Sequence, residues 1–260
     1  MCAQNTRKLN RLENELPEGL VVDAAWLEAR GFYGSLRKKY VDSGWLVQPA
    51  YRVYRRPRGE LSWEQVIVSL QTLLEVPVVV GGRTALERQG YAHYLPITQN
   101  EVHLYGECQP PSWLGKLQLN VSFVFHNTKR VFRTAPSGSS TISEPWGLWD
   151  WQLTLACPER AILELLDELP ERESFHQVDK LMEGLSTLRP RRLQTLLEAC
   201  KNIKVKRLFF FFADRHNHAW LKRIDRGRID LGRGKRMLVK GGKYISTYQI
   251  TIPESMDALQ

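Results

Sequence analysis

Three short patterns in the sequence have residue types and spacings that could support chemistry. In the first, Gly138-Ser139 precedes Asp150 at the spacing of nucleotidyltransferases, which need a second carboxylate two residues later to hold two metal ions. Gln152 stands at that position, so we interpret the segment as a loop. The P-loop, HExxH and GxSxG signatures do not occur, and neither does the E-x-K or D-x-K of many metal-dependent nucleases.

The other two patterns also favour structural roles. The segment Gly81-Gly82-Arg83-Thr84 could cradle a phosphate on exposed N–H groups at a strand-to-helix turn, but it is equally typical of a plain helix start, which we favour. Asp214, His216 and His218 could form a metal or acid–base site only in an extended chain, where positions i and i+2 share a face. We expect a helix end there instead. The sequence therefore predicts no catalytic residue, no metal site and no cofactor.

The basic residues are concentrated at the two ends of the chain. The net charge is +9, and residues 1–60 contribute 11 Lys and Arg against 7 Asp and Glu. Residues 203–260 contribute 13 against 5, whereas the stretch between them is slightly acidic. Because concentrated positive charge attracts polyanions, nucleic acid is the partner that this distribution predicts.

Composition limits the class of protein. The 260 residues are 43% hydrophobic and 25% charged, with no apolar run near the roughly 20 residues that span a bilayer. The first residues lack the apolar core of a secretion signal, so we expect a cytoplasmic protein without a membrane partner. Cys2, Cys108, Cys157 and Cys200 are far apart and form no CxxC pair, and we expect free thiols, the last two of them buried.

The elements that would present the N-terminal charges form a winged helix-turn-helix over about residues 6–58. We expect helices at Thr6–Leu16, with Thr6 as N-cap, at Ala24–Arg30, capped by Asp23, and at Ser35–Asp42. Trp45–Val47, Gln48–Ala50 and Tyr51–Tyr54 then indicate a strand, a turn and a strand. This order is typical of the motif, which places its third helix in the DNA major groove and its wing on phosphates or the minor groove.

The polar residues of the third helix and the wing are the candidate DNA contacts. They are Ser35, Arg37, Lys38, Lys39, Gln48, Arg52, Arg55 and Arg56. A second basic surface is expected from Lys204, Lys206, Arg207, Arg233, Lys235 and Arg236. The second set could extend the DNA footprint, bind RNA, or be a solvated face, and the sequence leaves these alternatives open.

The rest of the chain indicates mixed helices and strands, so the fold class is α+β. Helices are expected at Trp63–Glu75, Pro158–Leu169, Phe175–Leu185, Pro190–Cys200 and Val205–His216. Another helix is expected to start at Thr84, with a capping box between Thr84 and Glu87, and to end near Gly90. Strands are expected at Val76–Val80, Glu101–Tyr105, Val121–Phe125, Trp151–Leu155, Met237–Val239 and Tyr248–Ile252, and a loop at 134–147. We place a domain boundary at Pro96, which gives an N-terminal domain of residues 1–95 and a mixed α/β C-terminal domain of residues 96–260.

Several blocks of the sequence, in order, resemble the AbiEi antitoxins of type IV toxin–antitoxin systems. They are LPEGLVVDAAWLEARGFYGSLRKKYVDSGWL at 16–46, GGRTALERQGYAHYLP at 81–96, CPERAILELLDELP at 157–170, VKRLFFFFADRHNHAWLKRID at 205–225 and IDLGRGKRMLVKGGKY at 229–244. These systems are used in abortive phage infection. The resemblance implies a winged helix-turn-helix that represses the protein's own operon by binding inverted repeats at its promoter. It also implies a C-terminal antitoxin domain that counteracts an AbiEii-type nucleotidyltransferase toxin without a stable complex.

Two other functions remain as alternatives at this point. One is a nucleic-acid-processing enzyme with an unrecognised C-terminal site, and the other is a stand-alone transcription factor without a toxin. A nucleotidyltransferase in the adjacent gene would separate the last of these from an antitoxin.

Overall fold

The chain folds into two compact units. The computed structural model describes residues 2–91, 100–134, 136, 138–147 and 150–256. The first unit comprises Met1–Val78, Cys108–Phe123 and Ser143–Thr154, and the second comprises Val79–Glu107, Val124–Ile142 and Leu155–Gln260. The expected boundary at Pro96 lies outside the described residues.

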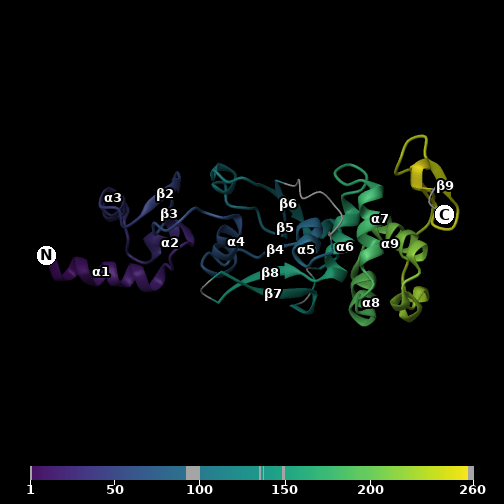
Figure 1. The fold of residues 1–260 in the computed structure, drawn as a ribbon, viewed down its shortest axis with the longest axis horizontal. Helices are drawn as coiled ribbons and strands as arrows, with labels where there is room; N and C mark the ends of the chain where they lie inside the picture. Colours follow the sequence, from purple (N-terminus) through teal and green to yellow (C-terminus); the bar gives the residue numbers. More distant parts are fainter. Residues whose placement is uncertain (1, 92–99, 135, 137, 148–149, 257–260) are drawn as a thin grey trace. The chain divides into compact units, whose positions relative to one another are not determined.

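The first unit opens with three helices and a small antiparallel sheet (Figure 1). The elements are α1 (Cys2–Glu15), β1 (Val21–Asp23), α2 (Ala24–Ala29), α3 (Gly34–Asp42), β2 (Val47–Ala50) and β3 (Val53–Arg55). The sheet order is β1-β3-β2. The three expected helices are confirmed, and so is the Asp23 cap, whose Oδ1 accepts a hydrogen bond from Trp26 N at 2.8 Å.

Two expectations for this region are wrong. Thr6 is not an N-cap, because α1 begins at Cys2 and no helix-breaking residue precedes Thr6 within it. The hairpin turn lies at Tyr51-Arg52 rather than at Gln48–Ala50, since Ala50 pairs with Val53 across the hairpin. Pro49 suggested a turn, but β2 is an edge strand, where a missing N–H is tolerated.

A compact apolar core holds these helices and strands together. It is made of residues from all three helices and the sheet: Leu12, Leu16, Val22, Ala24, Trp26, Leu27, Phe32, Tyr40, Leu46 and Tyr54. The Phe32 and Tyr40 rings pack with centroids 6.4 Å apart, which holds the turn before α3 against the last turn of that helix. The exposed face of α3 is set by this burial.

The middle of the chain contributes a helix and a five-stranded sheet. The elements are α4 (Trp63–Thr72), β4 (Val78–Val80), β5 (Glu101–Gly106), β6 (Ser122–Asn127), β7 (Thr141–Trp146) and β8 (Trp151–Ala156). The strand order is β6-β5-β4-β8-β7, and β4 pairs with β8 in parallel through Val80 and Leu155. A capping box between Ser62 and Gln65, which sequence reasoning missed, starts α4. The helix ends at Thr72, before the expected Glu75.

The loop expected at 134–147 is wrong for Thr141–Trp146, which is strand β7. Its Ser, Thr and Pro residues are typical of loops, but β7 lies at the sheet edge, where Pro145 is tolerated. The Ser143 hydroxyl donates to Gln152 Oε1 at 2.8 Å. Gln152, which stands in place of a second metal ligand, therefore has a role in holding β7 to β8.

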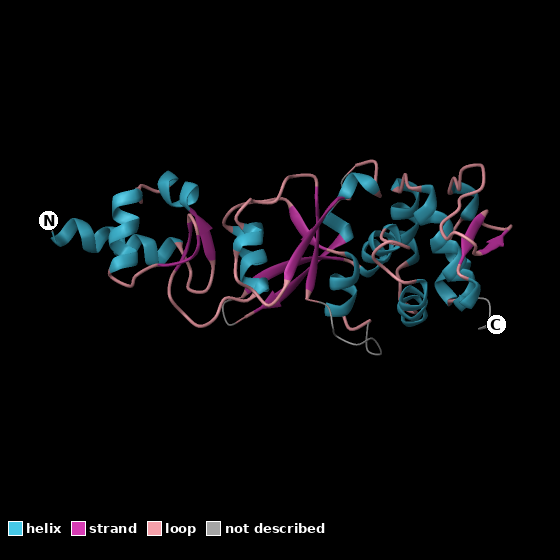
Figure 2. Cartoon of the chain, turned by 90° about the horizontal axis from the view of Figure 1, so that it is seen from above, coloured by secondary structure: helices cyan, strands magenta, loops and turns pink. Residues whose placement is uncertain are grey.

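Five helices form the body of the second unit, and Figure 2 shows helices as cyan coiled ribbons. They are α5 (Gly82–Arg88), α6 (Pro158–Asp167), α7 (Phe175–Gly184), α8 (Pro190–Ala199) and α9 (Ile203–His216). The expected buried helix is confirmed as α9, which packs on α6 and α7. Burial of both Cys157 and Cys200 as free thiols is also confirmed.

The Thr84 capping box is wrong, because α5 begins at Gly82 and Thr84 lies inside the helix. The Thr84 hydroxyl instead accepts a hydrogen bond from His103 N at 3.0 Å, which ties α5 to β5. A capping box needs the Thr at the boundary itself, and here the two glycines supply that boundary.

The C-terminal hairpin is formed by β9 (Lys243–Ile245) and β10 (Ile250–Ile252), so the expected first strand at Met237–Val239 is wrong. Leu238 N and Val239 N both donate to Thr251 Oγ1, at 2.8 and 3.1 Å. A side-chain hydroxyl thus satisfies backbone groups that a strand ladder would otherwise pair.

Within the described parts of the chain, every helix is too short or too polar to span a lipid bilayer.

Candidate nucleic-acid interface

Helix α3 presents a polar face to solvent. Ser35, Lys38 and Lys39 are exposed, whereas Tyr40 is buried and Leu36 is half-buried. Burial raises the pKa of Tyr40 above its ordinary value, consistent with a phenol held in the apolar core. Because the helix is anchored on this opposite side, both lysine side chains project away from the core, as a groove-reading helix requires.

Arg37 does not share that face, which corrects its expected accessibility. The residue is 7% exposed, and its side chain donates to the backbone oxygen of Phe32 at 2.8 Å. A second nitrogen lies 2.7 Å from Glu28 Oε1. A buried guanidinium with these partners fastens α3 to α2 and to the turn between them. Arg37 is therefore a structural residue of the helix pair.

The hairpin also divides its polar residues between solvent and interior. Gln48 and Arg52 are exposed, and Arg52 adopts a φ of 63° at the turn. Arg55 is buried and donates to the backbone oxygens of Arg58 and Gly59, so its expected accessibility is also corrected. Burial lowers the pKa of Arg55. The side chain of Arg55 holds the chain that leaves the hairpin.

Arg56 is half-buried and points back toward α1, which again differs from the expectation. It donates to the backbone oxygens of Glu13 and Leu16 and lies 3.1 Å from Glu18 Oε1. Its carboxylate partner already neutralises it. Of the eight residues nominated for DNA contact, five are exposed, namely Ser35, Lys38, Lys39, Gln48 and Arg52.

Three large exposed aromatic side chains accompany this exposed set, and sequence reasoning missed them. Tyr33 precedes α3, Trp45 follows it, and Tyr51 lies at the hairpin turn with 76% of its surface exposed. Their only signal in the sequence is their position at the ends of the expected elements.

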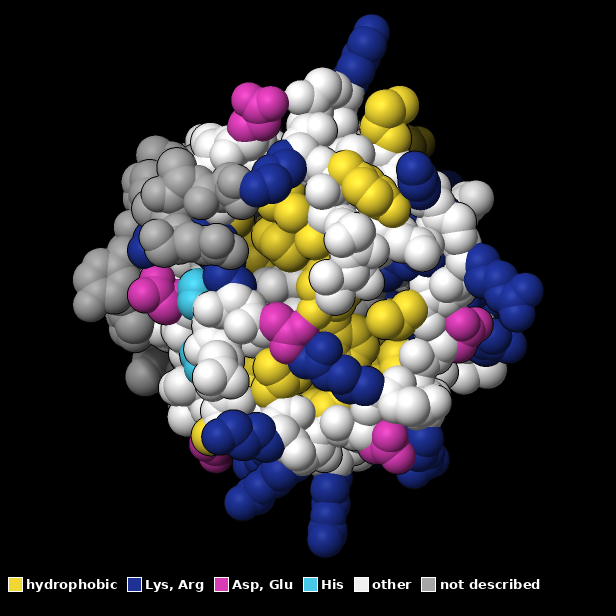
Figure 3. Space-filling model, turned by 90° about the vertical axis from the view of Figure 1, so that its right-hand side faces the viewer, with side chains coloured by type: hydrophobic (Ala, Val, Ile, Leu, Met, Phe, Trp, Pro, Cys, Tyr) yellow, Lys and Arg dark blue, Asp and Glu magenta, His cyan; other side chains and the backbone are white. Residues whose placement is uncertain are grey.

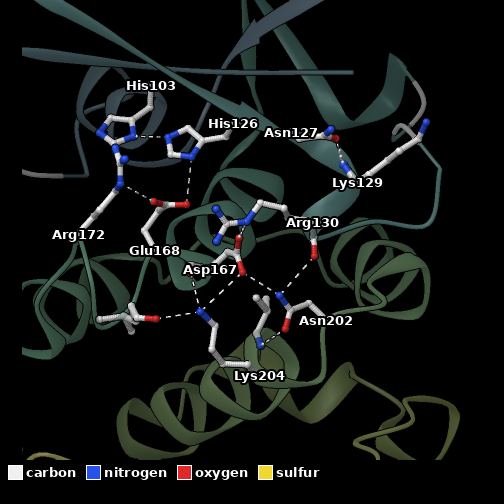
Figure 4. Close-up of polar contacts among 12 residues, drawn as sticks. His103, His126, Asn127, Lys129, Arg130, Asp167, Glu168, Arg172, Asn202 and Lys204 are labelled. Atoms are coloured by element: carbon white, nitrogen blue, oxygen red, sulfur yellow. Dashed lines mark hydrogen bonds and ion pairs between the residues drawn. The ribbon is translucent and has the colours of Figure 1, made fainter. Parts of the chain in front are cut away.

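Three of the six residues expected on the second basic surface are buried or held by contacts within the protein. Lys206 and Arg207 are buried, and Arg207 donates to the backbone oxygens of Leu231 and Gly234 at 2.7 and 2.6 Å. Lys204 donates to the backbone oxygens of Asp167 and Leu169 at 2.6 and 2.8 Å, as Figure 4 shows for the first. Lys204 and Arg207 therefore fasten α9 to its neighbours, and Lys206 is buried instead of facing solvent.

The other half of this surface is exposed. Arg233, Lys235 and Arg236 all face solvent, and the Lys235 ammonium lies 5.1 Å from the centre of the Tyr244 ring. Figure 3, which faces the C-terminal end of the chain, shows Lys and Arg side chains around the rim of an apolar area.

The residues that could have formed a metal or proton-transfer site are engaged in structural contacts. Asp214 pairs with Arg226 and Tyr248, and His216 Nε2 lies 2.9 Å from Asp179 Oδ1. His218 Nε2 lies 2.8 Å from the backbone oxygen of Met182. The helix ends between the two histidines, as expected. Over the ranges that the structure describes, no group of three His, Cys, Asp or Glu is placed to hold a metal.

The Gly81–Thr84 turn is likewise occupied by the protein itself. Gly82 N donates to Glu164 Oε2 at 3.1 Å, and Arg160 Nε donates to the other carboxylate oxygen at 2.6 Å. Burial raises the pKa of Glu164, although both hydrogen bonds oppose this. An internal carboxylate therefore takes the position that a phosphate would need.

A buried histidine pair in the second unit could not be foreseen, because its members come from separate strands. His103 Nδ1 on β5 lies 2.9 Å from His126 Nε2 on β6, and His126 Nδ1 lies 3.1 Å from Glu168 Oε1, as Figure 4 shows. Burial, with a further contribution from His126, lowers the pKa of His103 to about 4. The pair fastens the two strands to the end of α6.

Two family models together match almost the whole chain. Residues 5–97 match the model described as "Transcriptional regulator, AbiEi antitoxin N-terminal domain". Residues 99–253 match "Transcriptional regulator, AbiEi antitoxin, Type IV TA system". The chain belongs to the AbiEi antitoxin family. The AbiEi family consists of antitoxins of type IV toxin–antitoxin systems that act as transcriptional regulators.

A solved structure shares the AbiEi-type fold described here. The crystal structure of the RV2827C protein from Mycobacterium tuberculosis aligns with a TM-score of 0.60 and 16% sequence identity. The alignment covers 94% of this chain and 89% of that one, so the similarity of fold extends over both units. None of the curated proteins matches this chain.

Proposed function

We propose that this protein is a DNA-binding antitoxin that represses its own operon. In this proposal, α1–α3 and the β2–β3 hairpin form a winged helix-turn-helix within an N-terminal domain of residues 1–95. Lys38 and Lys39 carry the proposal, because both are exposed on α3 while the opposite side of the helix is anchored in the core. Membership of a family of transcriptional regulators supports the same function.

The exposed residues suggest how the contacts with DNA are divided. Lys38, Lys39 and Ser35 enter the major groove on α3, where side chains meet base edges and flanking phosphates. Gln48 and Arg52 contact the backbone or the minor groove from the hairpin. Arg37, Arg55 and Arg56 act indirectly by holding α3 and the hairpin in place.

The number of exposed cations sets the expected salt dependence. With Lys38, Lys39 and Arg52 each neutralising one phosphate, the slope of log affinity against log salt is about −3 for each bound copy. Titration of the protein onto a labelled duplex of its own upstream region, at several salt concentrations, measures this slope. Equal affinity for that duplex and for a scrambled one of the same length would contradict operator recognition.

For residues 96–260 we propose a non-enzymatic antitoxin function, directed against an AbiEii-type nucleotidyltransferase toxin without a stable complex. The engagement of Asp214, His216 and His218 in structural contacts supports a non-enzymatic role. Co-expression with an AbiEii-type nucleotidyltransferase toxin tests it. Growth should be restored by the wild type and by Asp214→Asn, provided that the variant remains folded. Loss of protection in a folded Asp214→Asn variant would point to chemistry at this position.

A further inference from the structure

A groove lined with arginines lies between α8 and the two short helices η4 (Ala219–Arg223) and η5 (Arg226–Arg228). Its volume is about 1040 Å³, and all of its lining residues belong to the second unit. The lining includes Arg189, Arg191, Arg192, Arg223 and Arg228.

Two of the five arginines are neutralised within the protein, and three are not. Arg192 Nη1 lies 3.3 Å from Glu159 Oε2, and Arg228 Nε lies 3.1 Å from Glu198 Oε1. Arg189, Arg191 and Arg223 are exposed. Among the residues placed in the structure, no carboxylate forms an ion pair with these three, which we call the rim arginines.

Hydrogen bonds fix the wall of the groove. Gln194 on α8 donates to the backbone oxygen of Asp225 at 3.2 Å and accepts from Asp225 N at 2.9 Å. The buried carboxylate of Glu159 accepts from Arg189 N at 2.6 Å, which fixes the start of α8. The backbone that carries the rim arginines is therefore held in place before any ligand arrives.

The lining chemistry favours anionic ligands, and phosphate is one that it fits. A guanidinium presents planar paired donors that match phosphate oxygens, and it keeps its charge at every physiological pH. The lining contains no Phe, Tyr or Trp on which a base could stack. Its two acidic residues, Glu198 and Asp225, leave an excess of three positive charges. We propose that this groove binds the phosphate groups of a nucleic-acid strand, without reading its sequence.

The test uses the full chain with Lys38→Ala and Lys39→Ala already in place, so that operator binding by α3 does not contribute. In that background, Arg189→Gln, Arg191→Gln and Arg223→Gln together remove the rim charges. The matched control removes three exposed charges elsewhere, with Lys116→Gln, Arg133→Gln and Lys201→Gln. Fluorescence anisotropy with a labelled 20-nucleotide RNA of arbitrary sequence measures binding, and circular dichroism confirms that each variant is folded.

We expect the rim variant to bind at least about tenfold more weakly than the control at 50 mM salt, with a salt slope shallower by about 2. Unlabelled duplex DNA and ATP are then added as competitors, to the parent and to the rim variant. Competition by the duplex that depends on the rim arginines identifies a nucleic-acid strand as the source of the phosphate, and such competition by ATP identifies a free nucleotide. Equal binding by the rim variant and the control overturns the proposal. Equal competition by poly-glutamate at matched charge also overturns it, because the groove would then recognise charge alone. An unchanged affinity of the rim variant for the promoter duplex, when Lys38 and Lys39 are intact, separates this site from the proposed operator contact.

Discussion

The guanidinium of Arg37 lies 2.7 Å from the carboxylate of Glu28, across the junction between α3 and α2. Lys38, its neighbour in sequence, is exposed on a different face of α3. Two adjacent basic residues thus have opposite roles, because a helix turns by about 100° for each residue. One holds the helix in place, and the other is free to meet a ligand.

The first prediction separates these roles by stability. Arg37→Met should lower the free energy of unfolding of the first unit by about 2 kcal/mol, because it removes a buried hydrogen bond to Phe32 and leaves Glu28 without its partner. Lys38→Met should change it by less than about 0.5 kcal/mol. Urea unfolding monitored by tryptophan fluorescence measures both, and equal effects of the two substitutions would contradict this assignment.

The second prediction concerns pH. The pKa of His103 is about 4 in the folded protein and about 6.5 when the chain is unfolded, so the unfolded state binds more protons between these values. Stability should therefore be full above pH 7 and decline as the pH falls toward 4. Between pH 7 and pH 5 this residue accounts for a loss of about 2 kcal/mol.

His103→Gln provides the comparison for this pH effect. The variant should be less stable than the wild type at pH 7, and its stability should decline less between pH 7 and pH 5. Denaturant titrations at the two pH values give both differences. A wild-type decline that His103→Gln reproduces in full would assign the effect to other groups.

The third prediction concerns the close approach of Gly81 to its neighbours. A Cβ at Gly81 would overlap Glu164 and the Tyr105 ring, both of which are buried. Gly81→Ala should therefore cost about 1–3 kcal/mol or more through overpacking. Gly115 has no atom within 4 Å of such a Cβ, so Gly115→Ala is the matched control and should be nearly neutral. Thermal unfolding of the two variants compares them, and similar melting temperatures would contradict the described packing of this turn.

The fourth prediction follows from the buried position of Arg207. Arg207→Met leaves the backbone oxygens of Leu231 and Gly234 without their donor, and it should destabilise the second unit by about 2–4 kcal/mol. Arg236→Met, on the exposed part of the C-terminal segment, should have little effect on stability. Hydrogen exchange of the Leu231–Gly234 segment should increase in the first variant alone. Unchanged exchange there would mean that Arg207 does not hold this segment.

The sequence predicted the elements whose pattern is local and long. The helices α6 to α9 follow from their apolar period, from Pro158 and Pro190 in first turns, and from the run of apolar residues in α9. Their burial in the core follows from the same pattern.

The errors arise where tertiary contacts decide the outcome. Pro49 and the Ser- and Thr-rich residues of β7 are tolerated because both strands lie at sheet edges, and sheet order is not visible in the sequence. The Thr251 hydroxyl accepts the hydrogen bonds of Leu238 N and Val239 N, which a neighbouring strand would otherwise accept, and Thr251 lies 12 or 13 residues further along the chain.

The candidate site shows the same limit. The sequence identifies the basic residues of α3, the hairpin and α9, but not the direction of each side chain. Arg55 and Arg207 lie in basic stretches of the sequence that are typical of a binding surface. In the structure, however, their guanidinium groups donate to backbone oxygens that the fold brings together. The arginine groove lies between α8 and residues about 30 positions later in the chain. The spacing of apolar residues within a short segment does not predict a contact over that distance in sequence.

The most direct test of DNA recognition by α3 is an affinity measurement with two double variants. Lys38→Ala with Lys39→Ala should weaken binding to the upstream duplex by at least about tenfold at 100 mM salt, and should make the salt slope shallower by about 2 for each bound copy. Lys116→Ala with Lys201→Ala removes two exposed charges elsewhere and should leave affinity within about twofold of the wild type. If the Lys38 and Lys39 variant is folded and binds the duplex as tightly as this control, α3 is not the helix that contacts DNA.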